Sequence, residues 1–293
     1  MKQASLSGKI FNAGNYIFLF LMAVICLLPL INVFAVSFSS STAASAGLVK
    51  LWPVEFTLKS YEYVLQKPEF LRAFGISLQR VVLGTTISMI LVTFLAYPLS
   101  KESKAFKGRT FYAWFFVLTM LVSGGLIPWY LIIKSVHLLD SLWALILPGG
   151  VVIFNVVLLL NFYRGLPKEL EEAATVDGAN HWTILAKIYI PLSGPALATI
   201  LLFTMVGHWN SWFDGLILMN RPEHYPLQSY LQTVVVNREF SLLDPNDISS
   251  LSEVSDRTLK GAQIFLAALP ILVVYPFLQR FFIKGVVMGS VKG

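Results

Sequence analysis

Long apolar runs alternate with polar segments along almost the whole chain, and this pattern predicts membrane-spanning helices. A helix needs about 20 mostly apolar residues to cross a hydrocarbon layer of about 30 Å, and six stretches of the chain are long enough. These stretches are residues 16–38, 75–99, 111–133, 141–162, 192–219 and 261–283. We therefore predict an all-α polytopic membrane protein with six transmembrane helices, built as a single transmembrane domain over residues 1–293.

Residues 163–191 form a polar, helix-forming segment between the fourth and fifth apolar runs. Pro167 suits a first helical position, and Gly178 suits the left-handed residue just past a helix end. Asn180 can then cap a second helix, which Pro191 closes. The small residues near Gly178 let another surface approach the backbone closely, so the segment has the features of a docking site at the membrane.

This polar segment resembles the EAA loop of ABC-importer permeases. Glu172-Ala173-Ala174 is followed by Gly178 and by the ending Ile188-Tyr189-Ile190-Pro191. The flanking Asp177-Gly178-Ala179 is similar to the carbohydrate-importer branch of the family, the maltose-type second permease subunit. Residues 275–293 are similar to subunits that import oligosaccharides from plant or algal polysaccharides, such as alginate or rhamnogalacturonan fragments.

The resemblance implies a cytoplasmic coupling loop over residues 163–191 that docks on an ATP-binding subunit. The residues that it assigns to docking are Glu171, Glu172, Ala173, Ala174, Asp177 and Gly178. It further implies a heterodimer with a second permease subunit, two ATP-binding subunits, an extracytoplasmic solute-binding protein and an oligosaccharide substrate, acidic fragments included. ATP and Mg²⁺ would then bind to the partner ATPase subunits, with no cofactor in this chain. ATP-driven closure would move the loop and swing the attached helices as rigid bodies.

Composition supports the membrane assignment and changes how the charge is interpreted. Hydrophobic residues make up 56% of the 293 residues and the mean hydropathy is +0.70, which excludes an ordinary soluble domain. A net charge of +6 would suggest a nucleic-acid partner in a soluble protein. In a membrane protein surrounded by lipid, basic residues instead hold short loops on the cytoplasmic side, so we predict no nucleic-acid partner.

The short basic loop over residues 101–109 sets the predicted orientation, because short loops orient a membrane protein and long ones contribute little. Both termini and residues 163–191 are then cytoplasmic, in a bacterial plasma (inner) membrane. Residues 221–260 become a long extracytoplasmic loop. A signal peptide ending near Ala44-Ser45-Ala46 is the alternative for the N-terminus. Its apolar run exceeds the roughly 7–15 residues of a signal core, which favours a retained helix.

Motifs for independent catalysis are absent from the sequence. Gly8-Lys9 lacks the Gly-x-x-x-x-Gly-Lys-Ser/Thr spacing of a phosphate-binding loop, so ATP would have to bind to another chain. The single Cys26 and the four histidines lie on separate segments, so we predict no metal site. A Gly-x-Ser-x-Gly elbow is also missing. We predict that the chain is not an enzyme.

Two charged residues lie inside the apolar runs, where leaving them in lipid is costly. Arg80 follows the start of the second run, and Asp214 precedes the end of the fifth. At 1.5 Å per residue both lie roughly 8 Å below the same predicted outer boundary. Equal depth allows Arg80 and Asp214 to pair or to line one cavity. The alternatives are snorkelling of Arg80 and an ordinary bundle contact for Asp214.

The residues around Asp214 suit sugars, which offer apolar ring faces and many hydroxyl groups. Helical spacing predicts Asn210 and Asp214 on one face, with tryptophans on a neighbouring face. Tryptophan near a boundary is also ordinary for membrane helices, and Asn155 is the kind of residue that bonds between helices. The candidate substrate-pathway residues are Arg80, Asn155, Trp209, Asn210, Trp212 and Asp214.

The leading interpretation is a permease subunit of an ATP-driven, binding-protein-dependent oligosaccharide importer. The alternative is an ion-coupled secondary transporter of a polar solute, which would need a charged or broken-helix site near the midplane of matching halves. Arg80 and Asp214 are too shallow for such a site. A membrane enzyme ranks third. Copurification of a stoichiometric ATPase would separate the first interpretation from the others.

Overall fold

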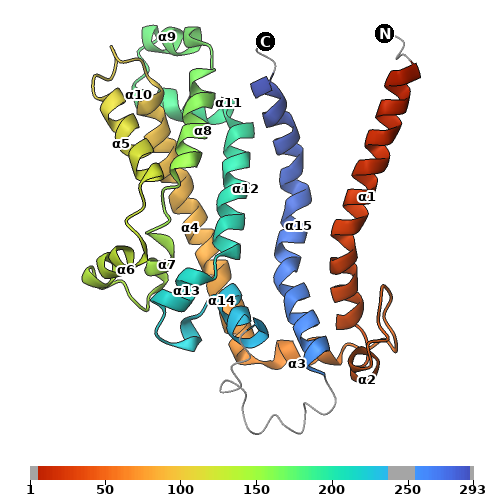
Figure 1. The fold of residues 1–293 in the computed structure, drawn as a ribbon. Helices are drawn as coiled ribbons and strands as arrows, with labels where there is room; N and C mark the ends of the chain where they lie inside the picture. The colour runs from red at the N-terminus through yellow and green to blue at the C-terminus, as the bar shows by residue number, and fades with distance from the viewer. Residues whose placement is uncertain (1–5, 237–254, 291–293) are drawn as a thin grey trace. The chain divides into compact units, whose positions relative to one another are not determined.

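The computed structural model describes residues 6–236 and 255–290, and the regular elements in these ranges are helices (Figure 1). The chain divides into two compact units. One comprises residues 1–70 and 233–269, and the other comprises residues 71–232 and 270–293. The predicted all-helical membrane architecture is confirmed at this level.

The first unit is built on one long apolar helix and the start of the last one. Its elements are α1 (Leu6–Ser37), α2 (Ser41–Ser45), α3 (Lys59–Gln66), most of the π-helix η3 (Gln232–Val236) and the beginning of α15 (Asp256–Ser290). A Cβ on Gly261 would lie 3.3 Å from the backbone nitrogen of Ser37, so α15 approaches α1 closely there. The rings of Phe34 and Phe265, 5.0 Å apart, extend this contact.

The second unit carries both candidate sites. The elements within it are α4 (Pro68–Ser100, from residue 71), α5 (Arg109–Leu121), α6 (Leu126–Ser135), α7 (Leu142–Ile146), α8 (Ile153–Arg164), α9 (Lys168–Val176), α10 (His181–Ile184), the π-helix η1 (Leu185–Tyr189), α11 (Ile190–Leu192), α12 (Gly194–Asn210), α13 (Phe213–Leu218), η2 (Pro222–His224), α14 (Leu227–Leu231) and the part of α15 from residue 270. A core from α4, α8 and α12 includes Ala96, Leu159 and Ile200. Within this unit α9 lies at one end and α13 and α14 lie at the other (Figure 1).

Among the residues that the structure describes, three helices are long and apolar enough to cross a membrane, or up to five spans if each bent pair counts as one. The three single helices are Ser7–Ser37, Pro68–Ser100 and Asp256–Phe277, which contain most of the first, second and sixth predicted runs. Arg109–Leu121 and Leu126–Ser135 are bent by 115° where the third run was predicted. Gly125, at a φ of +84°, lies in that break. Six spans therefore remain a prediction. A count by apolar length alone does not detect a break such as the one at Gly125.

The predicted long loop over residues 221–260 begins as ordered structure. Residues Pro222–His224 form a short helix, and α14 and η3 follow it. Gly215 leaves room for this segment, because a Cβ there would lie 2.1 Å from Ser229 Oγ. Residues 237–254, which make up much of the remaining predicted loop, lie outside the described residues, as do residues 291–293 of the C-terminal run.

Candidate functional site

The polar segment over residues 163–191 folds largely as its sequence predicts. Gly178 has the predicted left-handed conformation, with φ of +78°, just after α9. Asn180 caps α10, since its side-chain oxygen accepts a 2.9 Å hydrogen bond from the Thr183 amide. Pro167 is the N-cap of α9 rather than its first helical residue. Pro191 lies one residue before the end of the helical stretch His181–Leu192, so this helix ends one residue later than the sequence predicts.

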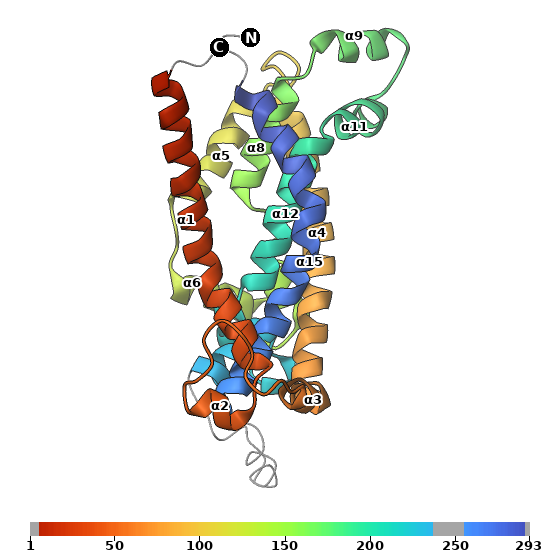
Figure 2. The same ribbon diagram turned by 90° about the vertical axis from the view of Figure 1, so that its right-hand side faces the viewer.

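The chain turns after Leu192. The helical stretch His181–Leu192 makes an angle of 81° with the next helix, Gly194–Asn210. Figure 2 shows α9 and α11 standing out from the end of the helices α4, α8 and α12. The coupling segment, as we call residues 163–191, is therefore continuous with α12 through a sharp bend. Movement of the segment would act directly on that helix.

The outer surface of α9 is open and partly apolar. Glu172, Ala173, Asp177 and Gly178 are exposed, and Val176 is 88% exposed. A Cβ on Gly178 would meet nothing within 4 Å in this chain. The missing side chain at Gly178 lets another surface approach the backbone closely at this point. Four of the predicted docking residues therefore lie on the accessible surface, namely Glu172, Ala173, Asp177 and Gly178.

Glu171 and Ala174 instead face their own chain. Ala174 packs against the core of α4, α8 and α12. Glu171 accepts a 2.7 Å hydrogen bond from Lys101 Nζ and a 2.6 Å hydrogen bond from the Tyr189 hydroxyl. Lys101 Nζ also lies 4.0 Å from the centre of the Tyr97 ring and 4.2 Å from that of Tyr189. We call Tyr97, Lys101, Glu171 and Tyr189 the lysine cage.

The lysine cage keeps Glu171 ionised. Burial opposes the charge, but the hydrogen bonds from Lys101 and Tyr189 outweigh it and hold the pKa of Glu171 below its usual range. A depressed carboxylate pKa means that the pairing is fully present at neutral pH and is lost as the pH falls through that lowered pKa. The cage is therefore intact at physiological pH.

At the opposite end of the unit, Arg80 of α4 and Asp214 of α13 form an ion pair, as their equal predicted depths allow. Arg80 Nη1 donates to Asp214 Oδ1 at 3.2 Å, and Nη2 contacts Oδ2. Arg80 is only 3% exposed. Asp214 Oδ1 also accepts hydrogen bonds from Ser211 Oγ at 2.8 Å and from the Gly215 amide at 2.9 Å. The carboxylate thus has partners other than Arg80.

The ion pair borders a cavity of about 550 Å³, to which Asn155 also contributes. Asn155 Nδ2 donates to Thr204 Oγ1 at 3.3 Å, which holds α8 against α12. His208 of α12 also lines the cavity, and a Cβ on Gly84 would lie 2.6 Å from its Nε2 atom. A side chain at position 84 would therefore require this imidazole to shift. The cavity therefore combines one buried cation with amide, hydroxyl and imidazole groups.

Three of the predicted pathway residues do not line this cavity. Trp209 is buried and packs its ring edge-on against Phe74, 5.7 Å between ring centres. Asn210 and Trp212 are exposed. The prediction that Asn210 and Asp214 share a helical face is wrong, because α12 ends at Asn210 and α13 begins only at Phe213.

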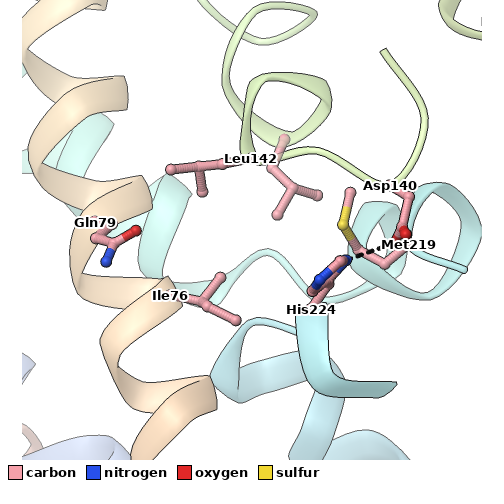
Figure 3. Close-up of a pocket in the computed structure, with 7 residues that line it drawn as sticks. Ile76, Gln79, Asp140, Leu142, Met219 and His224 are labelled. Atoms are coloured by element: carbon pink, nitrogen blue, oxygen red, sulfur yellow. Dashed lines mark hydrogen bonds and ion pairs between the residues drawn. The ribbon is translucent and has the colours of Figure 1, made fainter. Parts of the chain in front are cut away.

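A smaller cavity of about 140 Å³ lies nearby, and Figure 3 shows Asp140 and His224 meeting at its edge. Asp140 Oδ1 accepts hydrogen bonds from His224 Nδ1 at 2.8 Å and from the Asn220 amide at 3.0 Å. Its own amide donates to the Leu218 carbonyl at 2.9 Å. These contacts tie the connection before α7 to the segment after α13, which gives Asp140 a structural role.

Sequence reasoning missed the grouping of Tyr97, Lys101 and Tyr189 around Glu171. In the sequence alone, Lys101 indicates only a positive charge that orients a loop. A basic residue four positions after Tyr97, at the end of an apolar run, was the available signal. The partner of Lys101 is 70 residues away in sequence, so spacing could not identify it.

Residues 6–288 match the family of binding-protein-dependent transport system inner membrane components. The chain is 39% identical to protein LplC of Bacillus subtilis over 287 residues, which cover 98% of this chain and 96% of that protein. It is also 39% identical over 288 residues to the polygalacturonan/rhamnogalacturonan transport system permease protein YtcP of Bacillus subtilis. That match covers 98% of this chain and 100% of the relative.

A solved structure resembles the chain over almost its full length. It is the crystal structure of a bacterial ABC transporter involved in the import of the acidic polysaccharide alginate. The TM-score is 0.89 at 33% sequence identity, and the match covers 96% of this chain and 100% of the chain compared.

Proposed function

Because the chain belongs to the family of binding-protein-dependent transport system inner membrane components, we propose that it imports oligosaccharides that carry carboxylate groups. The chain is a multi-pass permease subunit of an ABC importer in the inner membrane, and it is not itself the ATPase. The observation that carries the substrate proposal is the buried guanidinium of Arg80 at the border of the 550 Å³ cavity. Cavities of about 300–1,000 Å³ are typical of small-ligand sites.

Two similarities support an acidic substrate. One relative is named for polygalacturonan and rhamnogalacturonan transport, and one structural relative serves the import of alginate. All three polysaccharides named there carry carboxylates. Arginine binds a carboxylate through two parallel hydrogen bonds, and in this structure Asp214 occupies that role. A sugar carboxylate would take the place of Asp214 as the partner of the Arg80 guanidinium. Asp214 would keep its hydrogen bonds from Ser211 and Gly215.

The proposed assembly has this chain paired with a second permease subunit, above two ATP-binding subunits and beneath a solute-binding protein. In it α9 docks in the cytoplasm on one ATP-binding subunit through Glu172, Ala173, Asp177 and Gly178. Their exposure and the positive φ of Gly178 support this assignment. The cavity at the α13 end then faces the extracytoplasmic side, and both termini are cytoplasmic.

Alternating access follows from rigid movements of helices around the cavity. Closure of the ATPase subunits would displace α9, and the 81° bend after Leu192 passes that displacement to α12. Asp214 follows α12 in the chain, whereas Arg80 lies on α4. Relative movement of α12 and α4 would separate the pair and expose the guanidinium to a substrate.

We expect Arg80→Gln to impair import of charged oligosaccharides selectively. A hydrogen bond to a charged group contributes about 1.5–3 kcal/mol, so uptake of trigalacturonate should fall by roughly 10-fold to 100-fold. The measurement is ATP-dependent uptake in proteoliposomes that contain the full importer and its solute-binding protein. Assembly should persist, because Ser211 and Gly215 still bond Asp214.

Arg72→Gln is the matched control, since Arg72 is an exposed arginine on the same helix. It should transport trigalacturonate like the wild type. Equal loss in the two variants, or full uptake by Arg80→Gln, would contradict a substrate role for Arg80. Uptake of maltotriose but not of trigalacturonate by the wild type would refute the acidic-substrate proposal itself.

The proposed orientation predicts which sides of the membrane react with an impermeant thiol reagent. In a Cys26→Ala background, Ser103→Cys and Thr175→Cys should react only from the cytoplasmic side, and Ser45→Cys only from outside. These three positions are exposed in the structure. Two other serines on the proposed outer side are not used as reporters. Ser60 is only 2% exposed, and Ser249 lies outside the described residues. Labelling of Thr175→Cys from outside would reverse the topology and remove the docking assignment.

A further inference from the structure

The lysine cage joins three separate parts of the chain at one buried point. Tyr97 and Lys101 belong to the end of α4 and the residue after it, Glu171 belongs to α9, and Tyr189 belongs to η1. The side chain of Lys101 is 10% exposed and that of Glu171 is 26% exposed. Tyr97 also reaches His181 at the start of α10, where its hydroxyl lies 3.2 Å from Nδ1.

A second ion pair between the same regions shows what is particular about the cage. Lys168, the first residue of α9, pairs with Glu102, the neighbour of Lys101. The side chains of Lys168 and Glu102 are 70% and 62% exposed, and exposed ion pairs of this kind contribute little to stability. The cage instead holds a largely buried ammonium between two aromatic faces, an arrangement in which cation–π attraction is strongest. The cage, and not the exposed pair, therefore fastens α9 to α4.

The helix fastened in this way leads directly to the cavity. α4 is one helix from Pro68 to Ser100, and at 1.5 Å per residue its Arg80 lies about 30 Å from the cage. Asp214 is reached by the other route, through the bend after Leu192 and along α12. Both Arg80 and Asp214 are thus connected to the coupling segment. Asp214 is connected through the covalent chain along α12, and Arg80 is connected through α4 and the lysine cage.

We propose that Lys101 is a positioning residue that makes α4 follow the movement of α9, so that ATPase closure reaches the Arg80 side of the cavity. The inference rests on the proposed docking of α9. Without the cage, α9 would still bind its ATPase and act on α12, but only apolar packing such as that of Ala174 would link its movement to α4. Hydrolysis of ATP would then continue while the cavity failed to open and close.

The test uses a reporter cysteine in the cavity and needs no knowledge of the substrate. Val152→Cys is placed in a Cys26→Ala background, because Val152 lines the cavity and is 42% exposed. The full importer in proteoliposomes is labelled with an impermeant maleimide, with and without ATP plus vanadate. With Lys101 present we expect the labelling rate to change by about fivefold or more, the lower end of typical coupling between sites.

Lys101→Met should abolish this change while ATP hydrolysis and bound ATPase persist. Lys101→Arg, which keeps the cation, should restore most of it. Tyr189→Phe keeps the ring and removes the hydroxyl bond to Glu171, and should reduce the change partially. Lys168→Met, at the exposed pair, should behave like the wild type.

Three results would overturn the proposal. The first is an ATP-dependent change in labelling rate in Lys101→Met as large as that of the wild type. The second is an equal loss of that change in Lys168→Met. The third is loss of the assembled complex in both Lys101→Met and Tyr189→Phe. The last would give the cage a purely structural role. Failure of the proposed docking is distinguishable, because Gly178→Val would then bind the ATPase like the wild type, whatever the labelling change in the Lys101 variants.

Discussion

Gly178→Val is expected to uncouple the importer by weakening the contact between α9 and its ATPase subunit. Gly178 has a φ of +78°, which a β-branched residue adopts only at a cost of about 1–3 kcal/mol. The valine side chain would also project into space that is empty in this chain and that we assign to the partner. Loss of a central interface position costs about 2 kcal/mol or more, so ATPase affinity should fall by at least about 30-fold. Pull-down of the ATPase from detergent-solubilised complex measures this.

Gly47→Val separates partner contact from backbone strain. Gly47 has a φ of +71°, and a Cβ there also meets nothing within 4 Å. It carries the same conformational penalty on a loop outside the coupling segment, so the ATPase should remain bound. Wild-type binding by Gly178→Val, or equal loss in both variants, would show that α9 does not dock through Gly178.

Asp214→Ala is expected to lose most of the assembled complex. The substitution leaves the guanidinium of Arg80, which is 3% exposed, without its carboxylate partner. Removing one member of a buried ion pair typically costs about 3–5 kcal/mol. The yield of monodisperse complex after size-exclusion chromatography should fall sharply, whereas Arg80→Gln should reduce it little.

A double variant makes the argument sharper. Arg80→Met combined with Asp214→Ala removes both charges, and replacement of a whole buried pair by apolar residues is often neutral. The double variant should therefore recover much of the yield that Asp214→Ala loses. No recovery would mean that Asp214 acts through Ser211 and Gly215 alone, and that pairing with Arg80 does not stabilise this end of the unit.

Local features of this chain were predictable and long-range ones were not. The left-handed Gly178 and the capping Asn180 follow from chemistry within a few residues, and the structure has both. Equal depth allowed the Arg80–Asp214 pair, because two runs that share a boundary bring equal depths together. The shared face of Asn210 and Asp214 failed, because the helical spacing assumed an unbroken helix through residue 212.

The lysine cage lay beyond sequence reasoning for a physical reason. Adjacent Glu171 and Glu172 look equivalent in sequence, yet one faces Lys101 and the other is exposed. Which carboxylate turns inward depends on the rotation of α9 about its axis, and that is set by packing of Ala174 against the core. A pattern of residue types does not contain this rotation.

The claim that α9 receives the ATPase is tested most directly by site-specific photo-crosslinking in intact membranes. A benzophenone amino acid in place of Val176, which is 88% exposed on α9, should form one major adduct, with the ATP-binding subunit. The same probe in place of Val122, 63% exposed between α5 and α6, should not form that adduct. A Val176 probe that crosslinks to lipid or to the second permease subunit, with no ATPase adduct, would contradict the account.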